Sequence, residues 1–191
     1  MVKILAFAGS ARKDSFNKKL VKVAAQGASE KGAEVTVIDL VDFPMPLFNQ
    51  DLEAAEGLPE KAREFKKLLI EHDGFLIASP EYNSAFSPLL KNSIDWASRV
   101  ESDDEPGLLA YRGKYAGIMA ASPGGLGGLR GLVFVRMLLN NLGITVIPEQ
   151  HALGQAFNAF GDDGNLVDEK KRTSVMNIGA KLTEVIGKIK A

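Results

Sequence analysis

Residues 74–88, Gly-Phe-Leu-Ile-Ala-Ser-Pro-Glu-Tyr-Asn-Ser-Ala-Phe-Ser-Pro, decide how this chain folds. The apolar run over residues 74–78 is typical of a buried strand, and Ser87 followed by Pro88 is typical of the start of a helix. The polar segment between them therefore joins a strand to a helix. Ligands bind beyond the carboxyl ends of the strands in open α/β sheets, so this segment is a candidate site.

The same alternation of strand and helix runs along the whole chain. Apolar runs predict strands over residues 2–8, 35–38, 74–78, 115–121 and 144–147, and helical periodicity predicts helices over residues 16–31, 59–71, 88–98, 129–142 and 168–188. A long irregular stretch over residues 42–51 is of the length that often carries function. Five strands alternating with five helices predict an α/β fold: one domain over residues 1–191, with a doubly wound, five-stranded parallel sheet in the order 2-1-3-4-5 and helices on both faces.

Composition excludes several classes of protein. The 191 residues include 23 basic and 24 acidic ones, for a net charge of −1, and no basic stripe that would indicate nucleic-acid binding. There is no cysteine, which excludes disulfides, thiolate metal sites and cysteine nucleophiles. His72 and His151 have no matching ligand or nucleophile nearby, so we expect no metal site and no catalytic triad. Because no run reaches the length of a membrane span and no signal sequence is recognised, we expect a cytoplasmic protein with no membrane partner.

The loop after the first strand offers the groups that a phosphate needs. Gly9 permits a tight turn, Ser10, Ser15 and Asn17 supply donors, and Arg12 supplies a positively charged fork. The helix that follows contributes free N–H groups and the positive end of its dipole. Two interpretations remain open at this point, a phosphate site and an ordinary polar loop with a serine cap.

The loop after the fourth strand is rich in glycine. Ser122, Gly124 and Gly125 would let backbone N–H groups approach a flat ligand closely, although a merely flexible loop has the same composition. The run over residues 124–131 does not have the spacing of a dinucleotide fingerprint, and no Walker sequence occurs. A dinucleotide-binding dehydrogenase is therefore disfavoured.

The segment after the third strand would form a further wall of the site. Pro80 stiffens it, Tyr82 offers a ring or a hydroxyl, and Asn83 can both donate and accept hydrogen bonds. Glu81 has two interpretations, an acid–base residue or a carboxylate held in an ion pair or at a subunit contact. The second is favoured.

These motifs together resemble one known family. The chain is similar to the NADPH-dependent FMN reductases, flavodoxin-like enzymes that include quinone, chromate and azo-dye reductases. The resemblance lies in Gly9-Ser10-x-Arg12-x-x-Ser15-x-Asn17, in Ser79-Pro80-Glu81-Tyr82-Asn83 with Lys91-Asn92-x-x-Asp95-Trp96, and in Ser122-x-Gly124-Gly125. It covers nearly the whole chain, and the tail after Gly154 matches least.

The resemblance implies a cofactor, a reaction and an assembly. FMN would be the cofactor, NADPH or NADH the co-substrate, and a quinone-like or other small molecule the electron acceptor. The cofactor-binding residues would be Ser10, Arg12, Ser15 and Asn17 for the phosphate and Pro80, Glu81, Tyr82, Asn83, Ser84, Ser122, Gly124 and Gly125 for the ring. A homodimer or homotetramer would place the ring near a subunit interface, to which residues 42–52 would contribute. No catalytic side chain and no metal are implied.

Two functions other than catalysis remain open. A flavodoxin-type electron carrier would bind the same cofactor, but such carriers tend to be strongly acidic, whereas this chain has a net charge of −1. A flavin-binding redox sensor would also fit the motifs. The near-neutral charge favours the enzyme over the carrier.

Overall fold

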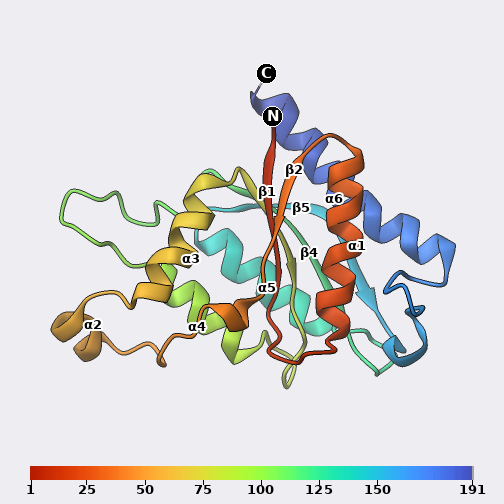
Figure 1. The fold of residues 1–191 in the computed structure, drawn as a ribbon, viewed down its shortest axis with the longest axis horizontal. Coiled ribbons are helices and arrows are strands. Elements are labelled where there is room, and N and C mark those ends of the chain that lie inside the picture. Colours follow the sequence, from red (N-terminus) through yellow and green to blue (C-terminus); the bar gives the residue numbers. More distant parts are fainter. Residues whose placement is uncertain (191) are drawn as a thin grey trace.

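The computed structural model describes residues 1–190 and contains a parallel sheet between two layers of helices (Figure 1). The strands are β1 (Lys3–Ala8), β2 (Glu34–Val37), β3 (Gly74–Ala78), β4 (Tyr115–Ala121) and β5 (Thr145–Leu153). The helices are α1 (Phe16–Glu30), α2 (Gln50–Glu56), α3 (Glu60–Glu71), α4 (Pro88–Ala97), α5 (Leu129–Asn141) and α6 (Glu169–Lys190), with short 3₁₀ turns η1 (Leu40–Asp42) and η2 (Ala156–Asn158).

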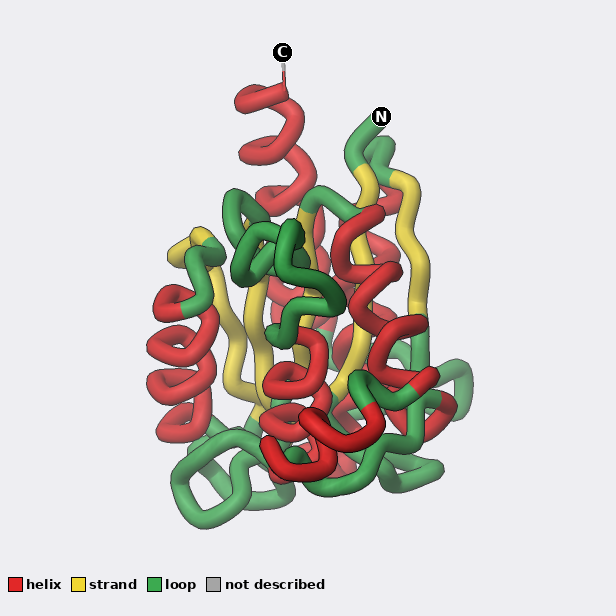
Figure 2. The backbone as a smooth tube through the Cα atoms, turned by 90° about the vertical axis from the view of Figure 1, so that its left-hand side faces the viewer, coloured by secondary structure: helices red, strands yellow, loops and turns green. Residues whose placement is uncertain are grey.

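The order of the strands is β2-β1-β3-β4-β5, and every pair is parallel. This confirms the order predicted from the sequence. All five residues of β3 are buried, because helices cover the sheet on both sides, and that burial explains the unbroken apolar runs of the central strands. Turned by 90°, the molecule shows the strands of the sheet side by side, with helices in front of them (Figure 2).

Each face of the sheet has its own hydrophobic core. Helices α1 and α6 pack on one face around residues such as Leu20, Ile178 and Leu182. On the other face, α3, α4 and α5 contribute to a second core that includes Phe65 and Leu69. Trp96 is fully buried in a smaller cluster beside α3.

An additional helix and a longer last strand are the main departures from the sequence prediction. A short helix, α2, follows the irregular stretch, because Asn49 accepts a hydrogen bond from the N–H of Asp51 and so starts a helix that the periodicity did not indicate. Strand β5 extends to Leu153 instead of ending at residue 147. Pro148 lies within a register shift, where the strand needs no N–H for the ladder, so the strand resumes beyond it.

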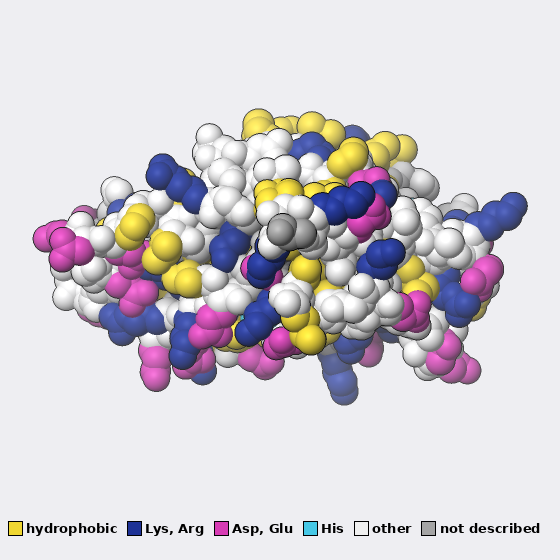
Figure 3. All heavy atoms as spheres, turned by 90° about the horizontal axis from the view of Figure 1, so that it is seen from above, with side chains coloured by type: hydrophobic (Ala, Val, Ile, Leu, Met, Phe, Trp, Pro, Cys, Tyr) yellow, Lys and Arg dark blue, Asp and Glu magenta, His cyan; other side chains and the backbone are white. Residues whose placement is uncertain are grey.

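The edge of the sheet opposite the loops carries mixed charge. Asp73 accepts hydrogen bonds there from the backbone N–H of Lys3 and the ammonium of Lys190, which hold the start of β1 beside the end of α6. Seen from this side, basic and acidic side chains alternate over the surface (Figure 3). Among residues 1–190, no helix combines the length and the apolar character needed to cross a membrane.

Candidate functional site at the carboxyl edge of the sheet

A tight turn forms the tip of the loop after β3. Tyr82 and Ala85 exchange backbone hydrogen bonds of 2.9 and 3.0 Å, and the two residues between them have positive φ angles, 49° at Asn83 and 69° at Ser84. Left-handed backbone costs energy in residues other than glycine, and asparagine tolerates it better than most. Such outliers gather at functional sites, so the turn is a second reason, besides its position, to place a site here.

Glu81 connects this loop to the start of α5. Its carboxylate accepts hydrogen bonds from Arg130 Nε (3.0 Å), Arg130 Nη2 (2.8 Å) and the backbone N–H of Gly131 (3.0 Å). Burial raises the pKa of the Glu81 carboxyl, but the hydrogen bonds from Gly131 and Arg130 outweigh burial, so its pKa lies below the ordinary value. Glu81 is therefore ionised and held in an ion pair, which supports the second of the two interpretations made from the sequence.

The glycine-rich loop after β4 is fixed by close packing. A Cβ on Gly127, whose φ is +64°, would lie 2.5 Å from the backbone carbon of Leu153, and a Cβ on Gly154 would lie 2.5 Å from the carbonyl oxygen of Gly125. A Cβ on Gly128 would lie 2.7 Å from the Cβ of Ala120, and a Cβ on Gly131 would lie 3.2 Å from the Cβ of Glu81. Since these contacts leave no room for side chains, the loop is held against the end of β5 and against Glu81.

The two loops enclose a cavity of about 410 Å³, which we call the loop cavity. Six predicted site residues line it: Glu81, Asn83, Ser84, Ser122, Gly124 and Gly125. Four further residues that the sequence prediction omitted also line it: Leu126, Gly127, Gly128 and Arg130. Pro80 and Tyr82 lie in the same loop but not on the lining, and Tyr82 is 53% exposed.

The predicted phosphate loop lies between β1 and α1. Ser15 is the N-cap of α1 and Ser10 is buried, and their hydroxyls accept only long hydrogen bonds of 3.4 Å from the N–H groups of Lys18 and Arg12. The Arg12 side chain is stacked over the Phe16 ring and, within residues 1–190, takes part in no ion pair. This loop therefore brings together two hydroxyls, a guanidinium without an acidic partner and the first N–H groups of α1.

Asn17 has a role that the sequence did not indicate. Its side-chain amide exchanges two hydrogen bonds of 2.9 Å with the backbone of Ala121, at the end of β4, and it is 4% exposed. It therefore joins the phosphate loop to the glycine-rich loop. One N–H of the amide remains to reach a phosphate, so the prediction that Asn17 binds phosphate stays a prediction, and its structural role is the better supported.

The two histidines take part in local contacts. His72 lies at the end of α3, where its ring nitrogens are 2.7 Å from the Leu68 carbonyl oxygen and 3.0 Å from the Thr36 hydroxyl. His151 Nδ1 lies 3.2 Å from the Ser174 hydroxyl, and burial lowers its pKa. Within the described residues, no group of three or more potential ligands is arranged to hold a metal ion.

FMN fits the three loops. Gly125 lines the loop cavity, and a Cβ there would meet no protein atom within 4 Å, so the packing of the protein itself does not require glycine at this position. The flat, backbone-lined wall that results suits a planar ring with polar edges. The phosphate loop adds a positive charge and N–H groups for an anionic end. The donor set thus matches a molecule that has a ring at one end and a phosphate at the other.

Comparison with known proteins agrees with this chemistry. A family model described as NADPH-dependent FMN reductase matches residues 2–158. This chain belongs to the NADPH-dependent FMN reductase family. The match includes all three loops of the site and confirms the resemblance drawn from the motifs.

Several named relatives of this FMN reductase family member are enzymes. A probable NADPH:quinone oxidoreductase of Oryza sativa is 36% identical over 171 residues, covering 87% of this chain and 80% of the relative. An NAD(P)H-dependent FMN reductase of Pseudomonas aeruginosa is 33% identical over 172 residues, covering 90% and 88%. The solved structure of FerB, a flavoenzyme NAD(P)H:(acceptor) oxidoreductase from Paracoccus denitrificans, superimposes with a TM-score of 0.79 at 29% identity and 98% coverage of both chains. The predicted flavodoxin-like fold is confirmed.

The tail after Gly154 supports the site although it resembles the family least. The backbone N–H of Gln155 donates to the Gly124 carbonyl oxygen (3.3 Å), and that of Ala156 donates to Ser122 (3.2 Å). Gln155 itself has a positive φ of 53°. These hydrogen bonds fix the backbone of the glycine-rich loop, so the first residues of the tail help to position it.

Proposed function

We propose that this protein is an FMN-dependent oxidoreductase that takes reducing equivalents from NADPH or NADH and delivers them to a quinone-like or other small acceptor. The observation that carries the proposal is the loop cavity, whose wall of glycine backbone faces the ionised, immobilised Glu81. Membership of the family and the names of the relatives support the same activity.

The residues of the chain bind and orient the cofactor. Ser10, Arg12 and Ser15 with the start of α1 would hold the phosphate, and the loop cavity would hold the ring. In the Tyr82–Ala85 turn, the N–H groups of Asn83 and Ser84 donate to no acceptor within residues 1–190, so they are free for the polar edge of the ring. FMN, when bound, supplies the two-electron chemistry that side chains lack.

No side chain at the loop cavity is placed as a proton donor. The pKa of Glu81 is lowered, and its oxygens are occupied by Arg130 and Gly131. A carboxylate in this state cannot donate a proton near neutral pH, so the chain positions the reactants and protons come from water. We therefore assign no catalytic acid or base.

We also propose that the protein assembles as a homodimer or homotetramer through α5. Leu129, Val133, Phe134 and Met137 on this helix are 45%, 65%, 41% and 61% exposed. Their spacing places apolar surface along one side of the helix, next to Leu126 at the rim of the loop cavity. A second copy would cover this stripe and close the cavity from outside. Light scattering of the protein and of Met137→Lys tests the assembly, since the variant should shift toward monomer. The cytoplasmic location expected from the sequence also remains a proposal.

One experiment tests the function directly. Purified protein should be yellow, should release FMN on denaturation, and should oxidise NADPH or NADH with a quinone as acceptor. A protein that binds FMN without turnover would point to the carrier or the sensor instead. Colourless protein that fails to bind added FMN would refute the cofactor assignment.

A matched pair of variants tests the phosphate loop. Ser15→Ala removes a donor to a charged oxygen, worth ~1.5–3 kcal/mol, and should weaken FMN binding at least ~10-fold. It also removes a helix cap, so Asn49→Ala, which removes the cap of α2 far from the loop, is the control. Equal FMN affinity in the two variants would contradict the phosphate assignment.

A further inference from the structure

Ser87 connects two segments of the site that are far apart in the sequence. It is the N-cap of α4, at the end of the loop after β3, and its hydroxyl accepts a hydrogen bond from the N–H of Leu90 (3.2 Å). The same hydroxyl donates to the carbonyl oxygen of Gly9 (2.5 Å), where the phosphate loop begins. Ser87 is 2% exposed, so both hydrogen bonds are shielded from water. One buried side chain therefore joins the loop assigned to the ring to the loop assigned to the phosphate.

Both backbone polar groups of Gly9 are fixed. Its N–H donates to the carbonyl oxygen of Ala78 at the end of β3 (2.9 Å), and its carbonyl oxygen accepts from Ser87. A Cβ on Gly9 would lie 2.8 Å from the Cβ of Leu90 and 2.9 Å from Oγ of Ser87, so this close approach to α4 requires glycine. Glycine backbone is conformationally permissive. The hydrogen bond from Ser87 is therefore what holds the peptide group after Gly9 in one orientation.

The same peptide group carries the N–H of Ser10. In a planar trans peptide, the carbonyl oxygen and the N–H point in opposite directions. Ser87 holds the Gly9 oxygen toward α4, so the Ser10 N–H is directed away from α4. Ser10 is 6% exposed, and its N–H donates to no acceptor within residues 1–190. A buried N–H without a partner is costly, so this donor suits an anionic oxygen supplied by a ligand.

Ser87 itself is not available to an anion. A serine hydroxyl has one proton to donate, and Ser87 donates it to Gly9. An ionised phosphate offers acceptors, so it would have to displace the Gly9 oxygen to bind Ser87 directly. Any effect of Ser87 on a bound phosphate is therefore exerted through the Gly9–Ser10 peptide.

We propose that Ser87 is a positioning residue, which acts through the Gly9–Ser10 peptide to orient the Ser10 N–H toward the phosphate of FMN. This inference rests on the proposed function, because FMN is the cofactor assigned there. Without the Ser87 hydroxyl, the peptide rotates at Gly9 and presents its carbonyl oxygen, which repels an anion. The phosphate then contributes less to flavin binding, whereas a ring held in the loop cavity is unaffected.

A comparison of FMN with riboflavin tests the proposal, because riboflavin has the same ring and lacks the phosphate. Fluorescence titration should show tighter binding of FMN to the native protein. Ser87→Ala should weaken FMN binding ~10-fold and change riboflavin binding by no more than ~2-fold, since one hydrogen bond to a charged oxygen is lost. A weakened cap on α4 would affect both flavins alike, so the ratio of the two affinities is the measure. An equal loss for both flavins would overturn the proposal.

Two further variants are matched controls. Ser93 is another serine of α4 that is 2% exposed, but its hydroxyl donates within the helix, to the carbonyl oxygen of Leu89 (2.9 Å). Ser93→Ala should therefore leave the ratio of FMN to riboflavin affinity unchanged. Ser87→Thr keeps the hydroxyl and should keep the ratio. A fall in the ratio as large as that in Ser87→Ala, in either variant, would indicate a general loosening of α4 and contradict the proposal.

NMR of the flavin-free protein separates this inference from the proposed function. On titration with inorganic phosphate, the Ser10 amide resonance should shift in the native protein and in Ser93→Ala, and should shift much less in Ser87→Ala. A protein that binds FMN without oxidising NADPH or NADH would contradict the proposed activity and leave this role of Ser87 intact. A Ser10 amide that ignores phosphate, or responds equally in Ser87→Ala, would overturn the role of Ser87 whatever the activity.

Discussion

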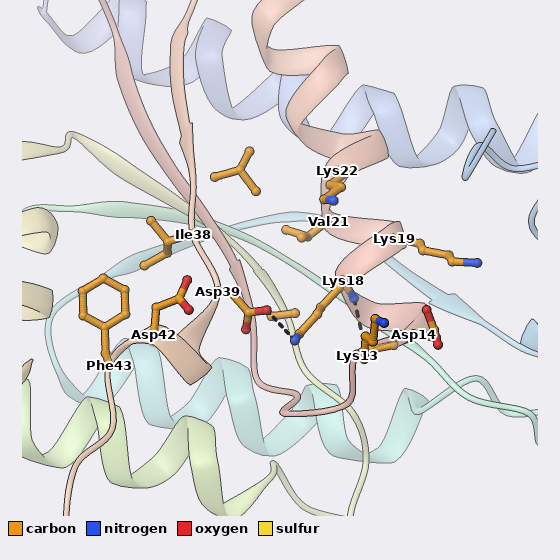
Figure 4. A pocket seen from close by; sticks show the side chains of 13 residues that line it. Lys13, Asp14, Lys18, Lys19, Val21, Lys22, Ile38, Asp39, Asp42 and Phe43 are labelled. Atoms are coloured by element: carbon orange, nitrogen blue, oxygen red, sulfur yellow. Dashed lines mark hydrogen bonds and ion pairs between the residues drawn. The ribbon is translucent and has the colours of Figure 1, made fainter.

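The loop cavity and a larger cavity of about 590 Å³, between α1 and the segment from the end of β2 through η1, are lined by different kinds of atom (Figure 4). The loop cavity has walls of backbone and small side chains, fixed by Gly127 against β5 and by Glu81 against α5. The larger cavity has long, exposed side chains on its lining, among them Lys13 and Lys22. A preorganised wall suits a cofactor that stays bound, because little ordering is left to do on binding. Exposed lysine side chains have many rotamers, so a ligand of the larger cavity would have to order them on binding.

The strongest test of the rigid wall is Gly127→Ala. The added Cβ would clash with the backbone of β5 at 2.5 Å and would sit on a residue with a φ of +64°, so we expect a loss of about 3–5 kcal/mol in the free energy of unfolding. Urea denaturation measures it. Gly32→Ala, with a φ of +93° but no atom within 4 Å, has the backbone penalty alone and should cost about 1–2 kcal/mol. Similar losses in the two variants would mean that the loop is free to move.

A smaller effect is expected from Glu81→Gln, which weakens the contact between the two loops. The variant should lose about 1–2 kcal/mol of stability at neutral pH, because hydrogen bonds from Arg130 and Gly131 to a charged oxygen are removed. A carboxyl whose pKa is lowered by folding stabilises the protein above its unfolded pKa, near 4.5, and loses that effect as pH falls through the lower folded value.

Stability curves against pH check this sign. The difference between the native protein and Glu81→Gln should be constant from neutral pH to about 5 and should shrink below pH 4.5. Glu169→Gln, which removes an exposed partner of Arg172, serves as the control and should show no such dependence. A difference that grows in acid would exclude an ionised Glu81.

Gly125→Ala separates binding from stability. Its Cβ meets no protein atom within 4 Å, so the free energy of unfolding should stay the same, while the Cβ intrudes on the loop cavity and should weaken FMN binding ~10-fold, or ~1.4 kcal/mol. Flavin fluorescence titration measures the affinity. Gly107→Ala, also without contacts but far from the site, is the control. Unchanged affinity in Gly125→Ala would place the ring elsewhere.

Sequence patterns predicted the fold because β1, β3 and β4 are largely apolar runs and the longer helices have a clear periodicity. The sheet order followed from the rules that govern parallel crossovers, and the order β2-β1-β3-β4-β5 confirms it. The exceptions have local causes. Pro148 is typical of the end of a strand, but it lies in a register shift within β5. Asn49 starts a helix that is too short to show a helical period.

The candidate site was predictable where one segment supplies its residues. The turn after β3 and the glycine-rich loop meet in the loop cavity because the carboxyl ends of neighbouring parallel strands share an edge. Pairings between distant segments were not predictable. The pairs Arg130–Glu81 and Asn17–Ala121 come into contact only in the folded chain. No local sequence pattern predicts either contact.

The hydrogen bonds between Asn17 and Ala121 also bear on the stage of folding at which the phosphate loop and the glycine-rich loop come together. It joins positions 104 residues apart, so it closes one of the longest loops between the two halves of the sheet. Contacts at such separation carry a large closure entropy and form late in folding. During synthesis, the phosphate loop emerges first and must wait for β4 before the second wall is present. With FMN at the site proposed above, its capture would follow assembly of the sheet, and the appearance of bound flavin would time the completion of folding.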